Sequence, residues 1–400
     1  MASKTLLEQF IAQLNANVFF SEFAFSATEL RVPGQGEVEL ADHLVLVEDL
    51  GIIFQLKERE ASAPADAAAL QAWFENKVQR KAVKQVRFTR DLLARFKGAR
   101  LANQRGHTVA VAPPDPGALH AVVVYRAPAA MGFTPRRYYD SKSAGFVHFI
   151  RDVDYLGICQ YLITPVEISE YLGFRRDVLV RVTAATAVSE AALVGQFLTG
   201  GLVDQPSSAF EGALRAFRED VAEWDMTFFL EQFGERITLR EGDDSETSHY
   251  RILAQFARLT RSELREFKLR LRLALEAVYE DRFELPYRFT CPRTDCGFLI
   301  VPLTRDAEPH ARTALTNLSL ASKYELAVSK HVSLAIVERS PHIDIEWMFA
   351  DGPNEPNPAL EARLGQSYPF RRIAQQVKPR YFFDSAELDQ SLGRPHGEGA

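Results

Sequence analysis

Three side chains near the start of the chain could together do hydrolytic chemistry at a phosphate: Asp42, Gln55 and Lys57. A divalent ion such as Mg²⁺ takes a few hard oxygen ligands and keeps several waters, so a carboxylate and an amide oxygen can hold it. An ammonium group beside the ion could orient the attacking water or stabilise the negative charge that develops on the phosphate. A lysine directed inward from an apolar strand is costly unless it has a partner, which makes Lys57 the most informative of the three.

A predicted β-hairpin brings these three side chains together. Val38–Val47 has the pattern of a strand, a polar turn follows, and Ile52–Lys57 has the pattern of its antiparallel partner. Residues two apart share one face of a strand, so Gln55 and Lys57 project together. The hairpin folds back and brings Asp42 near this pair. We therefore expect Asp42 and Gln55 to hold Mg²⁺ or Mn²⁺, and Lys57 to act on the water and the transition state.

Asp42 and the triplet Gln55-Leu56-Lys57 resemble two motifs of the PD-(D/E)xK, or restriction-endonuclease-like, nuclease superfamily. The likeness is closest to the Mrr-like and nuclease-related-domain branches, where glutamine can replace the acidic residue of the last motif. It covers roughly residues 20 to 125. The resemblance implies a metal-dependent nuclease with a central mixed sheet flanked by helices, and a role in bacterial restriction or defence. Gln55 is the departure that matters, because a neutral amide binds Mg²⁺ less strongly than a carboxylate.

The resemblance also implies supporting site residues. The family's early helix often supplies a glutamate, for which Glu22 is the candidate and Glu39 the runner-up. Related branches carry a polar residue on the helix after the hairpin. Gln85 fits this role, because its spacing from Val78 and Thr89 places it on the helix side that faces the sheet.

The helix predicted from about Ala67 to Lys97 has one apolar and one basic side. Its inward stripe consists of Phe74, Val78, Ala82, Val86, Thr89 and Leu93. The basic residues on the opposite arc are Lys77, Arg80, Lys81, Lys84 and Arg87. This local excess predicts a surface that faces the phosphates of nucleic acid, DNA in preference to RNA. The net charge of −6 gives no global support, and on charge alone a solvated helix face is an equal alternative.

The length of 400 residues predicts two domains. The order of helix, hairpin, long helix and further strands predicts a mixed α/β, restriction-endonuclease-like domain over residues 1–135. A polar connector over Arg136–Gly145 then leads into an α+β domain, residues 136–378, that would recognise substrate, sense a signal or mediate assembly. Residues 379–400 are polar and Gly-rich, which predicts a loose tail.

Composition limits the class of protein and its compartment. The three cysteines argue against a disulfide framework, although Cys291 and Cys296 leave a structural zinc site open as the less favoured alternative. No signal-peptide pattern and no apolar stretch long enough for a spanning helix occur, so we expect a soluble cytoplasmic protein without a membrane partner. Homo-oligomerisation stays open. The chain has no G-x-x-x-x-G-K-[ST] phosphate loop, G-x-G-x-x-G element or Ser-His-Asp signature.

Two other functions remain open on the sequence. One is a nuclease-derived module that binds nucleic acid or protein and has lost catalysis. The other is a hydrolase of another kind in the larger C-terminal region. His43, next to Asp42, should point to the opposite face of the strand and pack in the core.

Overall fold

The computed structural model describes residues 5–32, 36–60, 66–95, 100–110, 115, 118–128, 131–162, 164–200, 202–214, 225–226, 228–230, 233, 247–339, 342–373 and 375. Within these ranges, only the backbone is described for residues 27–32, 36–39 and 184. The chain divides into two compact units, one in the N-terminal part up to Glu219 and one spanning Asp220–Pro379. Each unit combines a β-sheet with helices, which confirms the predicted mixed α/β class.

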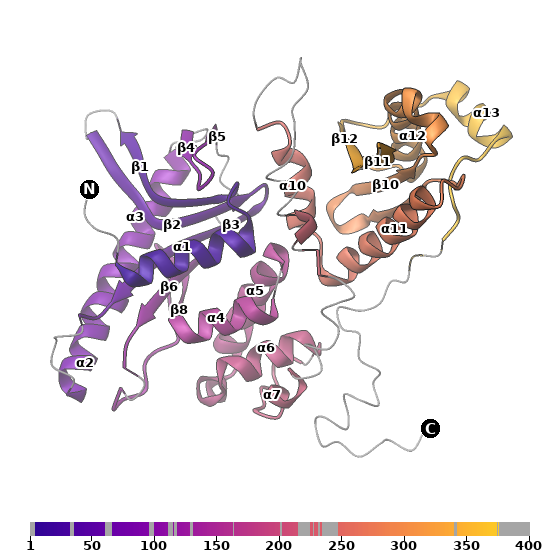
Figure 1. Cartoon of the computed structure of the whole chain (residues 1–400). Helices are drawn as coiled ribbons and strands as arrows, with labels where there is room; N and C mark the ends of the chain where they lie inside the picture. The colour runs from indigo at the N-terminus through magenta and orange to yellow at the C-terminus, as the bar shows by residue number, and fades with distance from the viewer. Residues whose placement is uncertain are drawn as a thin grey trace, which may run out of the picture. The chain divides into compact units, whose positions relative to one another are not determined.

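The first unit is built on a six-stranded sheet with the order β1-β2-β3-β6-β8-β7. Its strands are β1 (Ala24–Val32), β2 (Gly36–Val47), β3 (Leu50–Glu58), β6 (Leu119–Arg126), β7 (Tyr138–Ser141) and β8 (Gly145–Arg151). The hairpin predicted for β2 and β3 is confirmed, and both partners pair antiparallel. Strands β3, β6 and β8 run parallel, so the sheet is mixed (Figure 1). Two short strands, β4 (Arg100–Ala102) and β5 (Thr108–Ala110), form a separate ribbon.

The sheet continues past residue 135, where the sequence patterns place a connector. The connector prediction is wrong for β7 and the start of β8, which pair antiparallel and extend the sheet. The physical reason is burial: Val147 and Phe149 of β8 join the core of the first unit, and Tyr138 stacks on Phe146 across the pair. The predicted tail at 379–400 lies outside the described residues.

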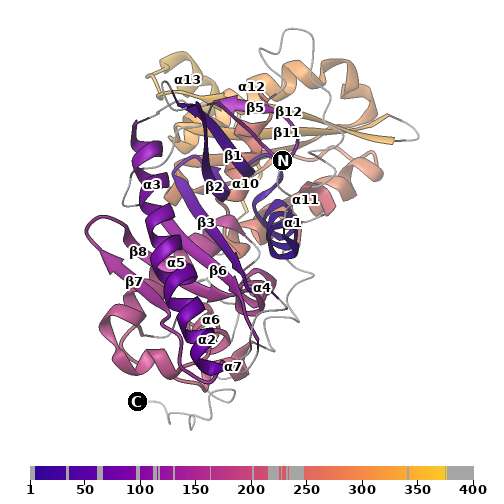
Figure 2. The same ribbon diagram turned by 90° about the vertical axis from the view of Figure 1, so that its left-hand side faces the viewer.

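Helices cover both faces of this sheet (Figures 1 and 2). One face carries α2 (Ala67–Trp73), the π-helix η1 (Phe74–Lys81) and α3 (Ala82–Arg95), which follow one another without a break. The other face carries α1 (Leu6–Phe19), α4 (Asp152–Tyr161) and α5 (Pro165–Arg181). α5 begins after Thr164, whose hydroxyl accepts a hydrogen bond from the backbone N–H of Glu167 and so caps the helix.

The predicted inward stripe of the long helix is confirmed, since all six residues are buried. Phe74, Val78, Ala82 and Val86 recur every four residues. A spacing of four residues is slightly more than one turn of an α-helix and slightly less than one turn of a π-helix. A stripe with this spacing therefore rotates around the helix axis in one direction along the α-helical segment and in the other direction along η1. The two rotations offset each other, and the stripe stays over the sheet. With the π-helical segment before it, α3 directs its buried side chains towards the β2–β3 hairpin.

The second unit contains a four-stranded sheet with the order β12-β11-β10-β9. Its strands are β9 (Tyr287–Cys291), β10 (Cys296–Pro302), β11 (Lys330–Arg339) and β12 (His342–Asp351). Its described helices include α10 (Tyr250–Ala257), α11 (Arg261–Tyr279), α12 (Ala311–Leu326) and α13 (Pro358–Gln366). α11 starts at a capping box formed by Thr260 and Glu263.

Cys291 and Cys296 lie opposite each other on β9 and β10, and both thiols are buried and not joined in a disulfide. Burial raises the pKa of the Cys291 thiol well above its ordinary value, which opposes the thiolate that zinc binds. No group of three His, Cys, Asp or Glu that could hold a metal occurs in the described part of the chain. The zinc alternative therefore gains no support. None of the described helices combines the length and apolarity needed to cross a bilayer.

A buried ion-pair network fastens α5 to the start of α6 (Glu190–Leu198). The Glu190 carboxylate accepts hydrogen bonds from Arg175 Nε at 2.7 Å and Arg137 NH2 at 2.6 Å, and also from the hydroxyl of Tyr171. Burial by itself raises the pKa of Glu190, but the two guanidinium groups outweigh it and lower the pKa to about 2. The paired carboxylate thus stabilises the fold as an anion.

Glu190→Gln is expected to lower the free energy of unfolding by about 3 kcal/mol near neutral pH, because Arg175 would stay buried without its counter-charge. The pKa of Glu190 in the folded protein lies below the ordinary 4.5, so the difference in free energy of unfolding between the wild type and the variant is fully present above pH 4.5. It should vanish as the pH falls towards about 2. Urea unfolding at several pH values measures this. Asp177→Asn, which breaks an exposed pair with Arg176, is the control with almost no expected effect.

Candidate functional site

The strands β2 and β3 stop pairing at Asp42. Their register runs from Val47 opposite Leu50 to His43 opposite Phe54 and goes no further. Beyond it, the Asp42 carboxylate takes the place of a backbone acceptor: Oδ2 accepts a hydrogen bond from the backbone N–H of Leu56 at 2.6 Å. The separation of the strands leaves space at this point for side chains from both.

The Lys57 ammonium contacts three oxygens at this separation. Its Nζ lies 3.1 Å from Asp42 Oδ2, 3.4 Å from Gln55 Oε1 and 2.9 Å from the carbonyl oxygen of Leu56. The side chains of Asp42 and Lys57 are each only 11% exposed, so solvent screens their attraction weakly. The structure therefore brings the acid, the amide and the ammonium to one point, as the hairpin pattern predicts. It also adds the carbonyl of Leu56, which the sequence patterns do not single out.

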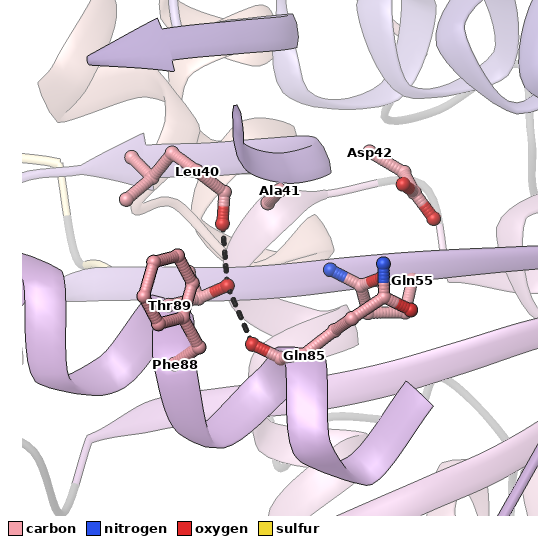
Figure 3. Close-up of a pocket in the computed structure, with 7 residues that line it drawn as sticks. All are labelled: Leu40, Ala41, Asp42, Gln55, Gln85, Phe88 and Thr89. Atoms are coloured by element: carbon pink, nitrogen blue, oxygen red, sulfur yellow. Dashed lines mark hydrogen bonds between the residues drawn. The ribbon is translucent and has the colours of Figure 1, made fainter. Parts of the chain in front are cut away.

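A small pocket opens beside this point, between the hairpin and α3, and its empty space of about 210 Å³ includes open solvent. Its lining residues are Leu40, Ala41, Asp42, Gln55, Gln85, Phe88 and Thr89. Figure 3 shows the side chains of Gln55 and Gln85 at the end of the pocket where Asp42 lies, and Phe88 at the other end. The Thr89 hydroxyl donates a hydrogen bond to the carbonyl oxygen of Leu40 at 2.5 Å. This bond joins α3 to β2 along one side of the pocket.

Gln85 enters this pocket from α3, as its spacing predicts. Its side-chain oxygen Oε1 is buried and has no hydrogen-bond partner among the described residues. An amide oxygen left in this state costs about 1–3 kcal/mol unless a ligand, ion or water satisfies it. An unsatisfied acceptor beside a carboxylate is the kind of group a cation can use.

The oxygens in the pocket fit a divalent cation such as Mg²⁺ or Mn²⁺. Asp42, Gln55 and Gln85 offer one carboxylate and two amide oxygens, all hard ligands of the type Mg²⁺ takes together with waters. Asp42 contributes the sole carboxylate among the pocket's lining residues, so the pocket by itself would neutralise only part of the charge of a divalent ion. Such an ion would be held more weakly than in a site with two or three carboxylates.

Glu22 is not among the residues that line the pocket. Its side chain is buried and pairs with Arg105, whose Nε donates to Glu22 Oε1 at 2.8 Å. The backbone carbonyl of Glu22 accepts a hydrogen bond from Asn103 Nδ2, so the residue fastens the end of α1 to the segment between β4 and β5. These contacts explain why Glu22 is buried, and they do not involve the pocket. The side chain of the runner-up, Glu39, lies outside the described side chains.

His43 packs on the other side of the sheet, as expected. Its ring is buried, contacts Phe54 edge to face, and lies with Nδ1 2.9 Å from the hydroxyl of Ser26. The side chain of Phe54 in turn contacts Tyr155 of α4, on the face opposite α3. Asp42 and His43 thus obey the alternation of a strand.

The five basic residues predicted on the long helix are all exposed, and we call them the basic helix face: Lys77, Arg80, Lys81, Lys84 and Arg87. None of the five forms an ion pair with another residue that the structure describes. Lys81 lies one turn before Gln85, and Lys84 one turn before Phe88, so part of this face borders the pocket. The sequence patterns do not single out Phe88. Its spacing of four residues from Lys84, which places the two on one side of the helix, can nevertheless be read from the sequence.

Polar groups in the second unit form a closed core network. The ring of His331 lies 2.8 Å from the Ser333 hydroxyl and 2.9 Å from the Ser322 hydroxyl, and Ser319 bonds to Ser333. All four residues are buried, and burial, followed by the charge of nearby Lys323, lowers the pKa of His331 to about 3. A neutral, satisfied histidine without access to solvent has a structural role, so this network gives the alternative of a hydrolase in the C-terminal region no support.

Comparison with protein-family models, with curated proteins and with solved structures finds no match to this chain.

Proposed function

We propose that the first unit is a metal-dependent nuclease that hydrolyses phosphodiester bonds, in DNA rather than RNA, with a role in bacterial restriction or defence. One observation carries the proposal: the Lys57 ammonium sits within hydrogen-bonding distance of Asp42 Oδ2 and Gln55 Oε1, beside a pocket that also contains Gln85. The exposed basic helix face borders the same pocket and offers positive charge to the phosphates of a nucleic acid.

Asp42 and Gln55 would hold the divalent ion, with the unsatisfied oxygen of Gln85 in support. When bound, the ion neutralises the phosphate and lowers the pKa of a water that can attack it. The Leu56 N–H holds the Asp42 carboxylate in place through its hydrogen bond, so the oxygen is oriented before a substrate arrives. Such preorganisation limits the reorganisation needed during the reaction.

Lys57 would serve the phosphate and the attacking water. In the structure its three proton-donor positions point at Asp42, Gln55 and the carbonyl of Leu56. These include Gln55 Oε1, the one side-chain oxygen with which Gln55 could hold the ion, so the Lys57 ammonium would have to release that oxygen to make room for it. A phosphate at the pocket would offer new acceptors to the released ammonium, which would then stabilise the negative charge of the transition state.

Gln55→Glu is expected to tighten Mg²⁺ binding on the order of tenfold, because it adds a second carboxylate at the point where Asp42 and Lys57 already meet. Titration calorimetry with Mg²⁺ alone measures this without a substrate. Gln71→Glu, on the exposed side of α2, adds the same charge away from the pocket and should leave the affinity unchanged. Equal affinities of Gln55→Glu and the wild type would contradict a metal-binding role for residue 55.

The triple variant Lys81→Ala, Lys84→Ala, Arg87→Ala is expected to weaken DNA binding and to flatten its dependence on salt. Each lost phosphate contact should reduce the slope of log K against log[salt] by about 0.9 on duplex DNA, hence by about 2 to 3 in total. Fluorescence anisotropy over a salt series, in EDTA, gives the slope. The double variant Lys142→Ala, Arg181→Ala removes exposed charges elsewhere in the first unit and should retain the wild-type slope.

The alternative function is a nuclease-derived binding module without catalysis. The single carboxylate of the pocket favours it, as does the ammonium of Lys57 close to the oxygens that would hold a metal. Incubation of plasmid DNA and of labelled single strands with the full chain and Mg²⁺ or Mn²⁺ separates the two functions. Metal-dependent products that disappear in EDTA support the nuclease. Tight, salt-dependent binding without products under any of these conditions would establish the binding module.

A further inference from the structure

Phe88 is a partly exposed aromatic ring at the edge of the pocket. It lines the pocket and is nevertheless 43% exposed, while its neighbours Val86 and Thr89 are buried. In Figure 3 its ring lies at the end of the pocket away from Asp42. A ring at the mouth of a polar pocket offers an apolar surface to a ligand of that pocket, and its burial on binding would be favourable.

Basic residues precede this ring along the helix. Lys84 lies one helical turn before Phe88, Arg87 precedes it in the chain, and Lys81 lies one turn before Gln85 in the same pocket. All three cations are exposed and form no ion pair with the residues that the structure describes. Asp91 is the one acidic residue of α3, and it is exposed as well. An exposed ring among unpaired cations is the combination with which proteins bind nucleotides: the ring stacks on a base while the cations contact the phosphates.

We propose that Phe88 stacks on an unpaired base, so that the pocket takes single-stranded nucleic acid. This inference rests on the proposed nuclease function and names its substrate class. The bases of a duplex are stacked on each other and paired, and their faces are closed to a side chain at the groove. A single strand offers free base faces along its length. The phosphate next to the stacked base would then lie toward the Asp42 end of the pocket.

Phe88→Ala is expected to weaken binding of a fluorescent oligo-dT strand by at least about fivefold, within the range found when a stacking ring is removed. Binding of a hairpin duplex with the same number of phosphates should change less than twofold. Phe88→Trp keeps a large ring and should bind the single strand as tightly as the wild type or more tightly. Phe283→Ala deletes an exposed phenylalanine of the second unit and serves as the matched control. All titrations are made with the full chain in EDTA, where no cleavage can occur.

The two proposals fail separately in this design. Equal affinity of Phe88→Ala and the wild type for the single strand overturns the stacking proposal, as does an equal loss on single strand and duplex. Neither result touches the cleavage assay. If the binding pattern is as expected and no metal yields products, the nuclease proposal fails while single-strand recognition by Phe88 stands. An oligo-U strand run in parallel should show the same loss as oligo-dT, because stacking on a base does not depend on the sugar, and a loss on only one of the two would contradict stacking.

Discussion

Lys57→Ala is expected to lower the rate of Mg²⁺-dependent cleavage by about 10²–10³-fold, the usual cost of removing one preorganised donor to a transition state. The loss should fall on kcat, because the ammonium turns to the phosphate and the water only when substrate and metal are bound. Mg²⁺ binding should persist or become tighter, since the variant removes a cation that contacts both Asp42 and Gln55. Steady-state cleavage of a labelled oligonucleotide and metal titration measure the two quantities.

The control for Lys57→Ala is Lys142→Ala, which removes an exposed lysine between β7 and β8. Asp42 keeps its hydrogen bond from the Leu56 N–H in the Lys57 variant, so a loss of stability of about 1–3 kcal/mol is expected and the chain should stay folded. Thermal unfolding followed by circular dichroism verifies this. A folded Lys57→Ala protein that cuts at the wild-type rate would exclude the catalytic role of the lysine.

Asp42→Asn is expected to reduce cleavage by about 10³-fold or more, because it removes the sole carboxylate among the pocket's lining residues. The substitution keeps the shape of the side chain, and the asparagine oxygen can still accept the hydrogen bond from Leu56. Unlike Lys57→Ala, this variant should bind Mg²⁺ far more weakly. The opposite responses of the two variants to metal distinguish a ligand from a group that acts on the phosphate.

Asp91→Asn is the matched control for Asp42→Asn, because it makes the same chemical change on the exposed side of α3. Removing this acid beside the basic helix face should leave metal binding unchanged and slightly strengthen DNA binding. If Asp42→Asn binds Mg²⁺ as tightly as the wild type does, Asp42 is not a ligand of the ion. The nuclease assignment would then lose its central residue.

The sequence determined the elements that carry the site. The apolar strands, the polar turn and the strand alternation are local properties, so they fix the hairpin and place Gln55 and Lys57 on one face. The inward stripe and the basic arc of the long helix follow in the same way from side-chain spacing, which also turns Gln85 towards the sheet. Residues that depend on a single element are therefore where the sequence patterns place them.

Only the tertiary structure decided which chain segments meet at the pocket. Where the strands part at Asp42, its carboxylate rather than a backbone group accepts the Leu56 N–H, and no pattern along one strand reveals this. Glu22 forms an ion pair with Arg105, which is far away in the sequence. The sequence alone could not show that the Glu22 carboxylate is engaged in this ion pair. Phe88 belongs to the pocket because of how α3 lies across β2. Long-range contacts of this kind depend on packing between elements, whereas periodicity describes each element by itself.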